Sequence, residues 1–233
     1  MRSRTLALAA ACGAALLAAA LPASAQGVRV LPRRALAGEG TVSAAALLAK
    51  VTGCAPLSHG KYRMDAGAPR TVPVCGAKGA VFWKADLDVD CDGQSGAVCN
   101  RRTDPYFQPD TRFHQSDDKP LDAAKLPYVV VPKPSRVWDY GTSGIKGGGV
   151  AAVIHGDKVA YAVVGDTGPK DTIGEASYAT AKALGLDPDP RTGGAESDVT
   201  YILFKDSEAI PIEEHSAAVS LGDELAQHFL ASN

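Results

Sequence analysis

Two acidic residues, Asp166 and Glu175, flank a polar loop and carry the side chains that general acid–base catalysis uses. Asp166 follows the apolar run Val159 to Val164, which predicts a strand. The turn residues Gly165 to Pro169 end that run, so Asp166 is expected where a strand ends. A carboxylate held at the end of a rigid element is well placed to transfer a proton.

Glu175 lies on the other side of the loop, immediately before the segment Ala176 to Leu184. This segment predicts a helix closed by Gly185, so Glu175 is expected where a helix begins. Structural roles are also open for both acids. An Asp in a turn commonly accepts a hydrogen bond from the backbone two residues on, and the helix dipole favours a Glu near a helix start.

A second group of acidic residues follows a strong strand pattern over residues 79–90, GAVFWKADLDVD. Alternation along an extended strand places four aspartates on one face, where their charges repel one another unless a cation neutralises them. A metal or a polyamine would serve, and solvation of the last aspartates in a turn is the alternative. The four are Asp86, Asp88, Asp90 and Asp92.

Metal and cofactor motifs are not matched. Read from Asp88, the acidic stretch begins like a calcium loop, but its twelfth position is Cys99 where a Glu is required. The cysteines lack Cys-x-x-Cys spacing, and the chain has neither Gly-x-Ser-x-Gly nor His-Glu-x-x-His. We therefore expect no metal and no cofactor.

The N-terminal region has the pattern of a secretory signal peptide over residues 1–25: two arginines, an apolar stretch and the small residues Ala23-Ser24-Ala25. Residues 26–42 mix Arg, Pro and Gly without periodicity and are expected to form a poorly ordered leader. The remaining residues 43–233 suffice for a single catalytic domain. We expect a secreted, extracellular protein with no membrane attachment once the signal is removed.

Charge and cysteine content fit this assignment. Without residues 1–25 the chain keeps 22 basic and 26 acidic residues, a formal charge of −4, which disfavours nucleic acid as a partner and is compatible with a cationic one. Four cysteines remain, and an even number in an exported chain predicts two disulfides. Of the three possible pairings, Cys91–Cys99 and Cys54–Cys75 are preferred.

Strands are predicted in the middle of the chain and helices towards its ends. Expected strands cover residues 79–90, 126–131, 150–154, 159–164 and 199–204, and expected helices lie after Ser43, at 176–184 and at 216–230. Gly156-Asp157 predicts the turn of a hairpin that leads towards Asp166. This pattern favours a mainly β fold, a barrel or a sandwich, with peripheral helices.

Four segments together resemble the family 75 glycoside hydrolases, the fungal-type chitosanases that also occur as secreted actinobacterial proteins. They are GAVFWKADLDVDCDGQ, TDPYFQ, LDAAKLPYVVVP and VAYAVVGDTGPKDTIGEAS, in this order between Cys75 and Phe204. The family's catalytic Asp in Gly-Asp-Thr and catalytic Glu in Gly-Glu-Ala match Asp166 and Glu175. By analogy with other inverting glycosidases we expect a six-stranded barrel-like core, with the double-psi type as one candidate.

The resemblance implies endo-hydrolysis of the β-1,4 bonds between glucosamine units of chitosan, with inversion. The sequence does not decide the two roles; we favour Glu175 as general acid and Asp166 as base. Chitosan carries protonated amines, so acidic residues are the candidates for substrate binding, and exposed aromatic rings the candidates for sugar stacking. These candidates are Asp86, Asp88, Asp90, Glu196, Tyr106 and Trp138.

One alternative stays open. The chain would then be a secreted, non-catalytic module that binds polysaccharide or is stabilised by calcium, with the acidic stretch as its working part. In either case we expect a monomer.

Overall fold

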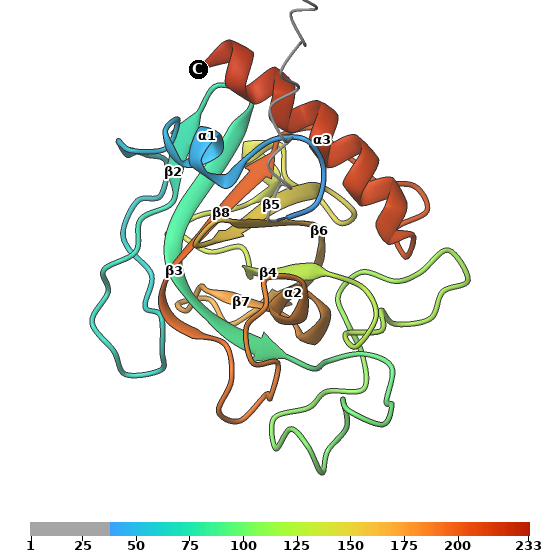
Figure 1. Ribbon diagram of the computed structural model, residues 1–233. Helices are drawn as coiled ribbons and strands as arrows, with labels where there is room; N and C mark the ends of the chain where they lie inside the picture. The colour runs from blue at the N-terminus through green and yellow to red at the C-terminus, as the bar shows by residue number, and fades with distance from the viewer. Residues whose placement is uncertain (1–37) are drawn as a thin grey trace, which may run out of the picture. The chain divides into compact units, whose positions relative to one another are not determined.

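Six strands close into a barrel in the computed structural model, which describes residues 38–233 (Figure 1). The order around the barrel is β3-β7-β4-β6-β5-β8, and β8 pairs again with β3. β1 (Ala55–Pro56) and β2 (Cys75–Ala77) extend the sheet beside β3. The barrel strands are β3 (Ala80–Asp90), β4 (Tyr128–Pro132), β5 (Val150–His155), β6 (Lys158–Gly168), β7 (Glu175–Ser177) and β8 (Ala195–Phe204).

The mainly β fold with a six-stranded barrel is confirmed, while the double-psi type stays a prediction. β3–β7 and β4–β6 pair in parallel, and the other pairs around the barrel are antiparallel. The predicted hairpin is present: His155 and Lys158 are paired across the Gly156-Asp157 turn.

Alternate residues of each strand fill the barrel interior with mostly small and β-branched side chains. Trp83 and Tyr201 stack there with ring centroids 5.3 Å apart. The strands therefore close around a packed core. The interior strand residues are Val81, Trp83, Ala85, Leu87, Val129, Val131, Ala151, Val153, Ala160, Ala162, Val164, Ala176, Val199, Tyr201 and Leu203.

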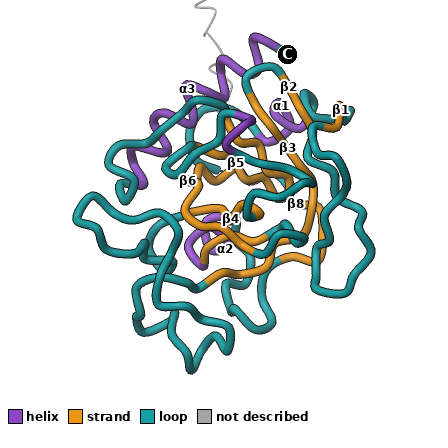
Figure 2. The backbone as a smooth tube through the Cα atoms, turned by 180° about the vertical axis from the view of Figure 1, so that it is seen from behind, coloured by secondary structure: helices purple, strands orange, loops and turns teal. Residues whose placement is uncertain are grey.

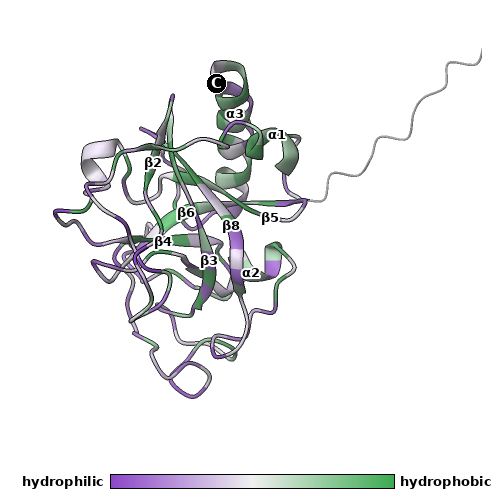
Figure 3. Cartoon of the chain, turned by 90° about the vertical axis from the view of Figure 1, so that its left-hand side faces the viewer, coloured by the Kyte–Doolittle hydropathy of each residue, from purple (hydrophilic) through white to green (hydrophobic). Residues whose placement is uncertain are grey.

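A second apolar cluster covers part of the outside of the barrel. α3 (His215–Ser232) packs over β5 and β6, and α1 (Ala44–Leu48), capped by Ser43 as predicted, lies beside α3. The long loops, together with α2 (Tyr178–Ala183), gather at the other end of the barrel (Figure 2). The strands are largely hydrophobic apart from a hydrophilic stretch of β8, whereas many hydrophilic residues lie in the loops (Figure 3). The 3-10 helix η1 (Gly141–Ser143) lies in the loop between β4 and β5.

Both preferred disulfides, Cys54–Cys75 and Cys91–Cys99, are present. The second one occupies the position where a calcium loop would need a Glu, so Cys99 is not free to bind a metal. Within residues 38–233 no helix combines the length and the apolar character that crossing a membrane would require.

The end of the predicted leader is held in place. The predicted signal peptide and residues 26–37 lie outside the described residues, but Glu39 donates its backbone N–H to the Val159 carbonyl at 2.9 Å. Its carboxylate accepts the N–H of Tyr161 at 2.8 Å, and Thr41 bonds to Asp223 of α3. The prediction of poor order was therefore wrong for residues 38–42, because this segment caps the exposed edge of β6.

Candidate active site

Asp166 and Glu175 project from the same outer face of the barrel. They come from β6 and β7, the two strands that flank β4. Asp166 is paired with Val130, and Ala176 is paired with the preceding β4 residue, Val129. Paired residues point to the same side of a sheet and successive residues alternate, so Glu175 lies on the Val130 side together with Asp166.

The strand β6 positions Asp166 through a bulge at Gly165. Val164 is paired with Val129, whereas Asp166 is paired with Val130, which leaves Gly165 as an extra residue. Without the bulge, alternation would turn Asp166 into the apolar interior beside Val164. The bulge therefore places a carboxylate on the outer face of a strand that otherwise reads as buried.

Replacing Gly165 by Ala is expected to destabilise the fold and to displace Asp166. A Cβ at this position would lie 2.6 Å from the Cβ of Tyr128 and 2.7 Å from Cδ1 of Leu121, both fully buried. Overpacking of this kind costs about 1–3 kcal/mol, so thermal melts should show a clear loss of stability. Gly53→Ala is the matched control, because no atom lies within 4 Å of its added Cβ. Equal melting temperatures for the two variants would contradict the prediction.

Both carboxylates lie within strands, which corrects two local predictions. β6 runs on through the expected turn to Gly168, so Asp166 is inside a strand and not at its end. Glu175 opens the three-residue strand β7, and α2 begins only at Tyr178 with Ser177 as its cap. β7 exists because Glu175 pairs with Asp88 of β3, a contact that local patterns do not contain.

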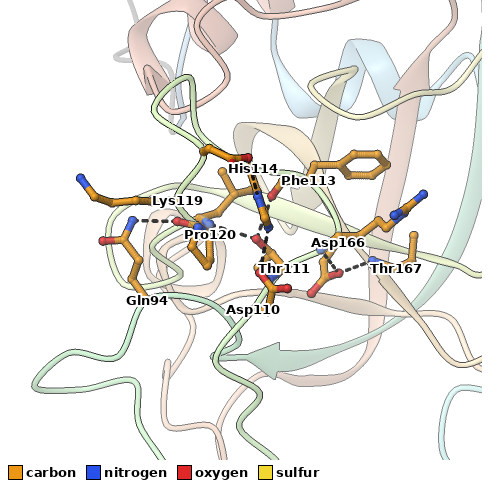
Figure 4. A network of polar contacts seen from close by, with 12 residues as sticks. Gln94, Asp110, Thr111, Phe113, His114, Lys119, Pro120, Asp166 and Thr167 are labelled. Carbon is orange, nitrogen blue, oxygen red and sulfur yellow. Dashed lines mark hydrogen bonds and ion pairs between the residues drawn. The ribbon is translucent and has the colours of Figure 1, made fainter.

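Asp166 has only 8% of its surface exposed, and one of its carboxylate oxygens accepts two hydrogen bonds. Oδ1 accepts the backbone N–H of Arg112 at 2.7 Å and that of Thr167 at 2.6 Å (Figure 4). Burial raises the pKa of Asp166, while these two hydrogen bonds and the charge of Lys133 oppose that shift. The hydrogen bonds favour the ionised form that a general base needs.

For Glu175, all the effects on the pKa of the carboxyl group act in the same direction and raise it. Its pKa is raised to about 7, mainly by burial and also by the charges of Asp88, Asp166 and Asp92. No hydrogen bond among the described residues stabilises its carboxylate form. Glu175 therefore keeps its proton at a pH where an ordinary glutamate has lost it, which is the state that a general acid needs.

The Glu175 carboxylate lies over Gly168 of β6, so Gly168→Ala should reduce turnover. A Cβ there would be 2.8 Å from Oε2 of Glu175 and 3.1 Å from Cγ1 of Val130. The carboxylate is the flexible end of a side chain, so it moves aside and the fold survives. A displacement of about 1 Å can lower kcat by about 100-fold. An unchanged kcat with normal melting would contradict this placement.

Five more aspartates lie close to Asp166 and Glu175 and form, with Asp166, two groups in which one oxygen of each residue lies within 4.8 Å of the others. One group is Asp65, Asp86 and Asp88; the other is Asp90, Asp92 and Asp166. Burial, followed by neighbouring charge, raises the pKa of Asp86 to about 8, and burial raises that of Asp92 to about 7. The prediction placed Asp86, Asp88, Asp90 and Asp92 on one face of an extended strand. It is confirmed for the first three, since their odd-numbered neighbours face the interior or its edge, but Asp92 lies beyond the end of β3.

Among the described residues, these acids form no ion pairs. No ion pair among residues 38–233 includes any carboxylate of the two groups, Glu175 or Glu196, although lysines and arginines elsewhere pair with other carboxylates. Glu196 lies in β8, which begins four residues before the strand expected at 199–204, and its charge contributes to the raised pKa of Asp88. The predicted binding residues Asp86, Asp88, Asp90 and Glu196 are therefore brought near Asp166 and Glu175.

The two aromatic candidates differ. Tyr106 is 84% exposed on a loop that is tied to the acidic group by the Gln108 N–H, which donates to Asp92 Oδ1 at 2.6 Å. Trp138 is 4% exposed, packs edge-on against Trp83 and donates its Nε1–H to Ser143. Trp138 has no free ring face, so its prediction as a sugar-stacking residue was wrong.

The amino-acid sequence is similar to those of known glycoside hydrolases. The model of the family described as "Fungal chitosanase of glycosyl hydrolase group 75" matches residues 87–230. Endo-chitosanase C of Aspergillus oryzae is 32% identical over 163 residues, which cover 66% of this chain and 40% of that protein. Another A. oryzae endo-chitosanase is 33% identical over 138 residues, covering 54% of this chain and 56% of that protein. An endo-chitosanase of Aspergillus fumigatus is 30% identical over 170 residues, 66% of this chain and 71% of that protein.

The chain thus spans about half the length of the two A. oryzae relatives. The family match itself covers more than half of this chain and includes the segments that carry both catalytic candidates. The chain belongs to glycosyl hydrolase group 75, the fungal chitosanase family.

Proposed function

We propose that this protein is a secreted endo-chitosanase that hydrolyses β-1,4 bonds between glucosamine units with inversion. Family membership and the names of the relatives support the substrate. The observation that carries the proposal is the pair Asp166 and Glu175 on one face of the barrel, among carboxylates without cationic partners in the described chain. Two disulfides are in keeping with export.

In this mechanism Glu175 is the general acid and Asp166 the general base. Glu175 gives its proton to the glycosidic oxygen as the bond from that oxygen to the anomeric carbon breaks. A water molecule attacks the anomeric carbon from the opposite face and passes a proton to Asp166, so the configuration inverts. Solvent then returns both carboxyl groups to their starting states.

The surrounding acids account for a cationic substrate. Each protonated amine of chitosan brings a positive charge to a face where several carboxylates are held close together, which strengthens both attraction and orientation. Because burial raises the pKa of acids such as Asp86 and Asp92, a bound cation also favours their ionised forms. An uncharged polymer of similar shape would gain neither effect.

The pH dependence of catalysis follows from the two carboxyl groups. Activity requires protonated Glu175, so kcat/KM should fall as pH rises through about 7. The value of kcat/KM should also fall at acidic pH, because Asp166 must be ionised. Since the pKa of Asp166 is raised, this fall should begin above the ordinary pKa of an aspartate. A cationic substrate lowers the pKa of Glu175 in the complex, so the alkaline limb of kcat should lie at lower pH than that of kcat/KM. An alkaline limb at the same pH for both would contradict this.

Product analysis tests the proposal directly. Purified protein is incubated with soluble chitosan, chain length is followed by mass spectrometry, and the anomeric form of fresh products by NMR. Internal cleavage with initial α-anomeric ends is expected. Initial β-anomeric ends would replace inversion by retention, and chitosan of unchanged length would exclude the hydrolase.

A further inference from the structure

The loop of residues 108–121 contacts the acidic face through its backbone. The N–H of Gln108 donates to Asp92 Oδ1 at 2.6 Å, and the N–H of Arg112 donates to Asp166 Oδ1 at 2.7 Å. Both hydrogen bonds that Asp166 accepts from the described residues end on Oδ1. The loop therefore helps to fix one oxygen of the proposed base, while Oδ2 stays free to take a proton from water.

One buried hydroxyl group fixes the part of this loop that contacts Asp166. Thr111 precedes Arg112 in the chain and is only 4% exposed. Its Oγ1 accepts the backbone N–H of Leu121 at 2.9 Å and donates to the backbone carbonyl of Phe113 at 2.8 Å (Figure 4). These bonds join the residues on both sides of Arg112 to each other and to the far end of the loop. The direction of the Arg112 N–H therefore depends on Thr111.

Leu121, to which Thr111 is bonded, is itself held in the core. It is fully buried, and its Cδ1 lies so close to Gly165 that a Cβ there would be 2.7 Å away. Its carbonyl accepts the backbone N–H of Gln94 at 2.9 Å. Thr111 therefore attaches the loop to a rigid point beside the bulge that positions Asp166.

The outer part of the loop is held by contacts at the surface. Lys119 pairs with Asp117, and His114 bonds to Asp110. Exposed pairs of this kind contribute little, because water and salt screen them. The two buried hydrogen bonds of Thr111 are therefore the stronger constraint on the backbone near Asp166.

We propose that Thr111 is a positioning residue for the general base: its hydroxyl holds the Arg112 N–H on Asp166 Oδ1 and thereby orients Oδ2 towards the attacking water. This rests on the role of Asp166 in the proposed function. Thr111 acts through the backbone of the next residue and does not need to touch the substrate. A displacement of the carboxylate by about 1 Å can lower turnover by about 100-fold.

The same hydrogen bond influences the charge state of Asp166. Burial raises the pKa of Asp166, and the N–H of Arg112 is the largest of the effects that oppose this shift. The charged groups around Asp166 are Lys133 after β4, Asp110 on the loop, Asp90 and Asp92 at and beyond the end of β3, and Glu175 on β7. None of these groups changes when Thr111 is replaced, so a shift in the pKa of Asp166 would report the lost hydrogen bond.

Thr111→Val keeps the shape of the side chain and removes its hydroxyl. On soluble chitosan kcat should fall about tenfold or more with KM unchanged. The acidic limb of kcat/KM should move about one unit to higher pH, because Asp166 loses a donor to its ionised form. Thr111→Ser keeps the hydroxyl and should restore both. In the Asp166→Asn background Thr111→Val should cost little further turnover, since it acts through Asp166.

Ser58→Ala is the matched control. Ser58 Oγ accepts the Val74 N–H at 3.0 Å and donates to the Gly60 carbonyl, as Thr111 does with Leu121 and with the residue two positions on. Its loop lies beside β2, which pairs with the first residues of β3 and not with its acidic end. Melting should occur at lower temperature, with kcat and the acidic limb unchanged. The same outcome for Thr111→Val, or a raised KM at unchanged kcat, would overturn the inference.

A carbon NMR titration of the Asp166 carboxyl, identified by its absence from Asp166→Asn, measures the pKa without substrate. If Thr111→Val does not fold, Thr111→Ala, which admits water to the Leu121 N–H, should show the same rise; loss of the fold in both would make Thr111 a structural residue and refute the proposal. Uncleaved chitosan with the unmodified protein would refute the proposed function, while the titration still tests Thr111. Cleavage with no rise in the pKa of Asp166 would refute only the role of Thr111.

Discussion

Glu175→Gln is expected to lower turnover of chitosan by about 10³-fold or more while leaving the fold intact. The amide cannot supply the proton that the leaving sugar oxygen requires, and general acid catalysis contributes about 10²–10⁴-fold. Glutamine fits the space over Gly168 and removes a charge that Asp88, Asp166 and Asp92 disfavour, so stability should not fall. Single-turnover rates and thermal melts on the same preparation measure both effects.

A substrate with an activated leaving group sharpens this test. A glucosamine oligomer that ends in a nitrophenyl group needs little protonation, so its cleavage by Glu175→Gln should recover most of the lost rate. The acid role would be wrong if this variant stayed equally slow on both substrates. It would belong to Asp166 if only Asp166→Asn were rescued.

Much of the barrel could be predicted because its strands carry their own alternation. β3, β5 and the β5–β6 turn appear almost as expected, since apolar residues face the interior at every second position. The position of Asp166 inside a strand could not be predicted in this way. It depends on the bulge at Gly165, where Tyr128 and Leu121 pack so closely that only glycine fits.

The candidate site residues likewise divide into those that a local sequence pattern reveals and those that depend on contacts made by the fold. Asp86, Asp88 and Asp90 could be identified because they alternate on one strand. Asp65 could not be placed beside Asp86 and Asp88 from the sequence, because contacts of its loop with residues 171–173, such as the Arg63–Thr172 bridge and the Arg63–Asp171 ion pair, bring it there and no local pattern encodes them. Trp138 was misassigned for a related reason: residue type predicts an aromatic surface, but burial against Trp83 is a property of the fold.

Asp166→Asn should also lower turnover by about 10²–10⁴-fold, for a different reason. Asparagine keeps an oxygen that can accept the N–H groups of Arg112 and Thr167, so the loop and β6 should stay in place and melting should change little. It cannot take a proton from water, so the loss should be equally large for chitosan and for the nitrophenyl substrate. This insensitivity to the leaving group distinguishes a lost base from a lost acid.

Asp110→Asn is the matched control for charge. Asp110 is well exposed, bonds to His114, and its charge helps to raise the pKa of Asp166. Its replacement removes one negative charge near the site without removing a proton acceptor from the reaction. Turnover should stay within about twofold of the unmodified protein, and the acidic limb of the pH profile should shift to lower pH because Asp166 ionises more readily. A loss as large as that of Asp166→Asn would mean that the acidic face acts through its total charge, and Asp166 could no longer be assigned as the base.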